Sequence, residues 1–196
     1  MFSAHARARA LLWNVVAAIN ANLSASLLLS TRAHLGVSGM MAYVAHQCRQ
    51  FVAGQIEAAV LQETLDRVFL GRTTRFDEDP PAGIPRNEQA IHVLKFIDSV
   101  DKLPEVAPGP RAKFRETYEY LSEFAHPNLQ ARMGDYHVDN GVVVFHRIPA
   151  IEEDELSVAL SGLRLSEFVV TVAHEHIQTL LSRWPGESTE ESVQNE

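Results

Sequence analysis

Apolar side chains recur at steps of three and four residues along most of the chain, which is the spacing that places them on one face of an α-helix. Residues 8–30 carry this pattern with almost no charge and residues 31–54 continue it, so we expect a closely packed core helix there, and whether a break interrupts it near residues 22–31 is left open. Residues 55–70 carry it with a charged opposite face, which predicts an amphipathic helix that ends at Gly71.

The helical pattern is lost in the middle of the chain and then returns. Residues 71–86 contain tandem prolines, glycines and a charge cluster, and they are expected to form a long loop. Asn87 is a suitable N-cap for a helix that continues to residue 103. Another helix is expected over residues 111–126, where apolar and aromatic side chains line one face.

A change of period after Pro127 predicts a β-hairpin. Asn140-Gly141 stands between two β-prone runs, and this dipeptide favours a two-residue turn. The expected cross-strand pairs are Asp139–Val142, Val138–Val143, His137–Val144, Tyr136–Phe145 and Asp135–His146. We expect the face with Tyr136, Val138, Val143 and Phe145 to pack on the helices, and the face with Asp135, His137, Val144 and His146 to be the more polar one.

A cluster of acids at 152–155 predicts the start of a long helix that ends near residue 184, because carboxylates are stabilised at the positive end of the helix dipole. The polar, acidic residues 187–196 are expected to be a disordered tail. The predicted fold is therefore all-α: one domain over residues 1–186, a helical bundle of five or six helices with one β-hairpin (about 132–148) inserted before the last long helix.

Composition narrows the function classes. A net charge of −8 argues against a general nucleic-acid surface, and the single cysteine, Cys48, excludes an intramolecular disulfide framework and favours a cytoplasmic location. The apolar run in residues 10–29 is interrupted by asparagines and serines, so no membrane span is expected there. We expect no cofactor and no metal of the usual motif classes, and the Ala- and Gly-rich N-terminal helices suggest a homo-oligomer.

His126 is the main candidate for chemistry. It follows Ser122 and Glu123 by four and three residues, so all three would share one side of the predicted helix, with Glu119 two turns back. A serine-type triad would also need an exposed nucleophile on a sharp turn and an oxyanion hole, which this segment does not offer. The alternative is structural: His126 would bond to the last carbonyls of the helix, a contact worth roughly 0.3–1 kcal/mol.

Two further groups of residues deserve a hypothesis. Arg32 stands in a segment with almost no other charge, and if buried it would need an acceptor such as Glu123 or Glu119. Asp135, His137 and His146 share the polar hairpin face and could bind a metal ion, although such faces are usually solvated. By contrast, His174 and His176 point about 200° apart on a helix and cannot share a metal.

The segments IHVLKFIDSVDK (91–102) and YEYLSEFAHPN (118–128) resemble a set of uncharacterised bacterial helical proteins with a Leu-Ser-Glu-x-x-His-Pro-Asn motif. The resemblance covers residues 25–145, and SEFAHPN is its most specific element. The arginine of their upstream helix corresponds to Arg32, but the acid expected four residues later is replaced here by Gly36. Such proteins are similar to distant members of the HEPN superfamily, helical bundles found among toxin and phage-defence RNases.

The resemblance implies a metal-independent RNase in which an arginine and a histidine flank the scissile phosphate. The usual short Arg-to-His spacing is missing, because the nearest upstream arginine, Arg115, precedes His126 by eleven residues, about 16 Å along a helix. Under this alternative the catalytic residues would be His126, Glu123 and either Arg32 or Arg132, and RNA would be the partner. The first hypothesis is a non-catalytic interaction protein linked to defence or stress, and a metal-dependent or other hydrolase is the third.

Overall fold

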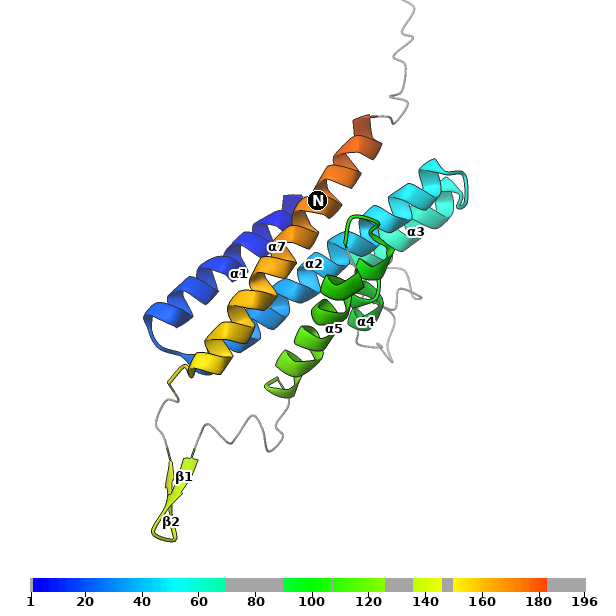
Figure 1. Cartoon of the computed structure of the whole chain (residues 1–196). Helices are drawn as coiled ribbons and strands as arrows, with labels where there is room; N and C mark the ends of the chain where they lie inside the picture. Colours follow the sequence, from blue (N-terminus) through cyan, green and yellow to red (C-terminus); the bar gives the residue numbers. More distant parts are fainter. Residues whose placement is uncertain (1, 70–89, 107, 126–135, 146–149, 183–196) are drawn as a thin grey trace, which may run out of the picture.

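Two long helices form the centre of the fold. The computed structural model describes residues 2–69, 90–106, 108–125, 136–145 and 150–182. Within them α2 (Ser24–Val52) packs along α7 (Glu153–Ser182), and α1 (Phe2–Asn20) packs along α2 (Figure 1).

The shorter helices cover another side of α2. They are α3 (Ala58–Phe69), α4 (Val93–Ile97), the 3-10 helix η1 (Val100–Lys102) and α5 (Pro108–Glu123). The described residues thus contain six α-helices, which confirms the all-α prediction and its expected number of helices. The predicted loop 71–86, the N-cap Asn87 and the tail 187–196 lie outside the described residues.

The break between the first two helices, which the sequence left open, falls at residues 21–23. Asn22 adopts a φ of 55°, a left-handed conformation that asparagine tolerates better than most residues. Its side-chain oxygen accepts a hydrogen bond of 2.9 Å from the backbone N–H of Ile151. The turn therefore also fixes the segment that leads into α7. There, Ser24 donates a 2.8 Å hydrogen bond to Glu155, one of three acids in the first turn of α7.

The helix expected over 87–103 is wrong in length. α4 has five residues and begins after His92, whose Nδ1 accepts from the N–H of Leu94 at 3.3 Å. Asp98 and Ser99 follow as a turn, and Ser99 donates to the carbonyl of Lys95 at 2.6 Å. Hydroxyl and carboxylate side chains of this kind compete with the helical hydrogen-bond ladder, which explains the early end.

The two strands β1 (Tyr136–Asp139) and β2 (Val142–Phe145) pair antiparallel in the register Tyr136–Phe145, His137–Val144, Val138–Val143 and Asp139–Val142. The fifth expected pair, Asp135–His146, lies outside the described residues. Asn140 and Gly141 have φ values of 47° and 80°, as a type I′ turn requires. Val138 is 63% exposed, so its expected packing on the helices is wrong.

The core lies between α2, α5 and α7, where Leu35, Phe114, Leu121 and Val169 are all fully buried. Gly162 of α7 faces both α5 and α2. A Cβ at that position would lie 3.0 Å from Thr117 Cγ2 of α5 and 3.4 Å from Thr31 Cγ2 of α2. The missing side chain therefore allows three helices to meet at one point.

Candidate functional site

Arg32 is held against the C-terminal half of α5. Its Nε donates to Ser122 Oγ at 2.9 Å, and Ser122 donates in turn to the carbonyl of Tyr118 at 2.7 Å. The guanidinium also lies 5.1 Å from the centre of the Tyr118 ring, within cation–π range. Arg32 is half-buried, and these contacts connect it to the serine of the LSEFAHPN element.

Of the two acids expected to pair with Arg32, Glu119 pairs with another residue. Glu119 accepts from Arg115 Nε at 2.8 Å, one turn away on the same helix, and Arg115 also pairs with Asp98. Glu123 is the exposed last residue of α5. The helix ends there rather than at residue 126, and His126 lies outside the described residues.

Most of the other residues that the sequence suggested for chemistry lie outside the described residues. Arg132, Asp135 and His146 lie outside the described residues, and His137 belongs to β1. Within the part of the chain that the structure describes, no group of three or more His, Cys, Asp or Glu residues is placed so as to hold a metal ion.

A Ser–His–Glu arrangement that the sequence did not suggest joins α2 to α7. His34 Nδ1 lies 2.5 Å from Ser166 Oγ, and Ser166 Oγ lies 2.8 Å from Ser38 Oγ. On the other side of the imidazole ring, His34 Nε2 lies 3.1 Å from Glu167 Oε1, but without the geometry of a hydrogen bond. Serine, imidazole and carboxylate thus follow one another in the order of a nucleophilic triad.

Burial decides what this arrangement can do. His34, Ser38 and Ser166 are all 0% exposed, and only the Glu167 side chain reaches solvent, at 47%. Burial lowers the pKa of His34, and the neighbouring Glu167 carboxylate offsets part of that effect. A nucleophile that no substrate can reach does not react, so this set of residues fixes α2 against α7.

Two other histidine contacts link helices near the surface. His5 Nε2 of α1 lies 2.9 Å from His174 Nδ1 of α7, and burial together with His174 lowers the pKa of His5. His176 Nε2 lies 2.7 Å from Glu105 Oε1, with the Arg49 guanidinium 3.4 Å from the same ring. Both are structural contacts that join distant parts of the chain, and among the described residues neither has a third ligand-type side chain that could complete a metal site.

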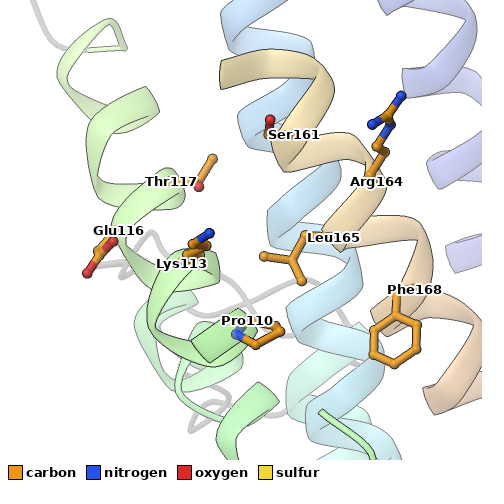
Figure 2. Close-up of a pocket in the computed structure, with 8 residues that line it drawn as sticks. All are labelled: Pro110, Lys113, Glu116, Thr117, Ser161, Arg164, Leu165 and Phe168. Carbon is orange, nitrogen blue, oxygen red and sulfur yellow. The ribbon is translucent and has the colours of Figure 1, made fainter. Parts of the chain in front are cut away.

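A groove with a volume of about 470 Å³ lies between α5 and α7. Each helix contributes four side chains to it (Figure 2). Leu165, Phe168 and Pro110 form an apolar floor, and Phe168 is 44% exposed. Lys113 and Thr117 lie on the side of α5 that faces α7, whereas the Glu116 carboxylate points away from it (Figure 2).

Sequence reasoning missed both the buried network and the groove. His34 recurs with Leu27, Thr31, Leu35 and Ser38 at helical spacing, and Ser166 follows Gly162 on the apolar face of α7. Polar residues on two apolar faces are a signal of an internal hydrogen-bond network, because each needs a partner. The groove had no such signal, since it depends on how two distant segments pack.

Comparison with known proteins gives no further assignment: no family model, curated protein or solved structure matches this chain. Among the described helices, α7 is long and apolar enough to cross a membrane by length and composition, and 44% of its most apolar window is buried within the bundle. A core helix meets the same criterion.

Proposed function

We propose that this protein is a non-catalytic binding protein of the cytoplasm that acts through the groove between α5 and α7. The observation that carries the proposal is the contrast between that groove and the polar clusters. The groove is open, apolar and large enough for a small ligand, since ligand sites commonly measure about 300–1,000 Å³. The Ser–His–Glu arrangement is closed to solvent at its serine and histidine.

A homo-oligomer is part of the same proposal. α1 exposes Trp13 at 63% and Val16 at 47%, one turn apart on the same helix. Large apolar side chains grouped on a surface favour association. Sedimentation of the wild-type protein and Trp13→Ser should show a larger species that the substitution dissociates, and a wild-type monomer would remove this part of the proposal.

The second candidate is the metal-independent RNase. It is favoured by the contact between Arg32 and Ser122, because Ser122 belongs to the LSEFAHPN element and precedes His126 by four residues. An arginine held on that element is the group that the alternative requires. The acidic net charge of −8 favours the binding protein instead.

The experiment that separates the two candidates is incubation of purified protein with total RNA in the presence of a chelator. Wild-type protein, His126→Ala, Arg32→Ala and the control Arg7→Ala, an exposed arginine of α1, are compared. The binding proposal predicts intact RNA in every sample. Cleavage by the wild type and Arg7→Ala that is lost in His126→Ala and Arg32→Ala would replace it with the RNase.

A further inference from the structure

The groove is closed at one end, where α5 and α7 are in close contact. At the closed end, Thr117 of α5 approaches Gly162 of α7 so closely that a Cβ on that glycine would lie 3.0 Å from Thr117 Cγ2. Further along the groove, Pro110 of α5 lies opposite Phe168 of α7 (Figure 2). The six steps from residue 162 to residue 168 span about 9 Å of helix, which sets the length of the floor.

The charge of the groove is asymmetric. Lys113 is the cation on the side of α5 that faces α7, and the Glu116 carboxylate points away (Figure 2). Arg164 lies on the far edge of α7 in the same view, so it adds positive charge around the groove without covering the floor. The ammonium of Lys113 therefore has an apolar surface beside it and no acid from the groove lining turned toward it.

A ligand that complements this surface must combine an alkyl part with an anionic end. We propose that the groove binds a single anionic amphiphile of the medium-chain fatty acid class, with the chain over Leu165 and Phe168 and the carboxylate beside Lys113. This inference rests on the proposed binding function. The ligand is one free molecule rather than a lipid surface, because the floor is short and closed at Gly162.

The test is isothermal titration calorimetry of the full chain with decanoate and with uncharged decanol, both below the concentration at which they aggregate. We expect saturable one-to-one binding of decanoate, about 1.4- to fivefold tighter than decanol, because an exposed ion pair contributes roughly 0.2–1 kcal/mol. Lys113→Gln should reduce decanoate to the affinity of decanol and leave decanol unchanged.

Two further variants test the apolar floor. Phe168→Ser should weaken both ligands about tenfold, because the ligand would cover the part of the ring that is still in water. Leu181→Ser removes an apolar side chain of similar exposure, 53%, from the end of the same helix and should change neither affinity. Ser161→Trp, at an exposed position of the lining, should fill the groove and block binding without removing any core residue.

Several results would overturn the inference. They are the absence of saturable heat with decanoate, equal affinities for decanoate and decanol in the wild type, or unchanged binding in both Phe168→Ser and Ser161→Trp. Preferential adsorption to phosphatidylglycerol vesicles with no decanoate binding would instead assign the surface to a membrane. Because the RNA assay uses neither ligand, a failure here leaves the binding function standing, and RNA cleavage would remove the function without deciding this site.

Discussion

Ser166→Ala is the substitution that tests most sharply how α2 is fixed against α7. The Ser166 hydroxyl is the partner of His34 Nδ1 at 2.5 Å and of Ser38 Oγ at 2.8 Å. Ser38 keeps other acceptors when that hydroxyl is removed, since it also donates to the carbonyls of His34 and Leu35 at 3.0 Å. His34 keeps no hydrogen bond of normal geometry, because its Nε2 only has the 3.1 Å contact with Glu167 Oε1.

The expected loss of stability follows from this difference between Ser38 and His34. One buried imidazole nitrogen is left without a partner, and an orphaned buried polar group costs about 1–3 kcal/mol. We expect Ser166→Ala to lower the free energy of unfolding by that amount, or the melting temperature by roughly 2–4 °C per kcal/mol. Urea denaturation followed by circular dichroism measures it.

Thr171→Ala is the matched control. It removes a hydroxyl from the same helix, but Thr171 is exposed and its hydroxyl bonds only to the carbonyl of Glu167 in its own helix, at 3.0 Å. The control should stay within about 0.5 kcal/mol of the wild type. Equal stabilities of Ser166→Ala and Thr171→Ala would show that the buried network does not hold the two helices together, and the reasoning would be refuted.

Further predictions concern pH, close helix packing and thiol reactivity. Burial lowers the pKa of His34 below its ordinary 6.5, so below that pH the unfolded chain binds a proton that the folded chain does not. The free energy of unfolding is therefore full above pH 6.5 and falls as the pH drops below it. A stability that stays constant between pH 7 and 5 in the wild type, or the same pH dependence in His34→Gln, would contradict this. Gly39→Ala should destabilise the protein by about 1–3 kcal/mol in urea titrations, because the new Cβ would meet the Phe96 carbonyl carbon and oxygen at 3.0 Å. In the control Gly36→Ala the nearest atom belongs to Val93 at 3.8 Å, so this variant should be more stable by about 0.5–1 kcal/mol. A stabilising Gly39→Ala would count against the close approach of α2 and α4. Burial raises the pKa of the Cys48 thiol, so alkylation by iodoacetamide at pH 8 should be slower than for the unfolded chain in urea, and equal rates would argue against that burial.

The helical architecture could be predicted because its signal is local. The three- and four-residue spacing of apolar side chains identifies α2 and α7. The end of α2 and both ends of α7 lie within a few residues of the expected positions, whereas the start of α2 falls at the break that the sequence leaves open. The turn at Asn140-Gly141 was also readable, since it depends on the φ preferences of two adjacent residues.

The errors arose where tertiary packing or side-chain competition decides the outcome. The helix expected over 87–103 shortens to Val93–Ile97 because Ser99 bonds back to the chain and α4 packs its backbone on Gly39. The expected partners of Arg32 were acids, but the structure gives it a hydroxyl and an aromatic ring. Such choices depend on which residues face one another across the bundle, and the order of residues along the chain does not contain that information directly.

The candidate site, too, could be predicted from the sequence only in part. Arg32 was recognisable as an arginine in need of a partner, and the structure supplies Ser122 as that partner. The groove between α5 and α7 was not predictable, because Lys113 and Phe168 are fifty-five positions apart in the sequence and neither belongs to a motif. A surface hollow forms from the packing angle of two helices, which single-sequence periodicity does not determine.

The most direct test of the account is a nuclear magnetic resonance titration of the isotope-labelled full chain with decanoate. If the groove is the binding surface, amide shift changes should be largest in residues 108–117 of α5 and 161–168 of α7, should saturate, and should disappear in Ser161→Trp. Shift changes centred on the exposed Trp13 face of α1, or no saturating change anywhere, would contradict it.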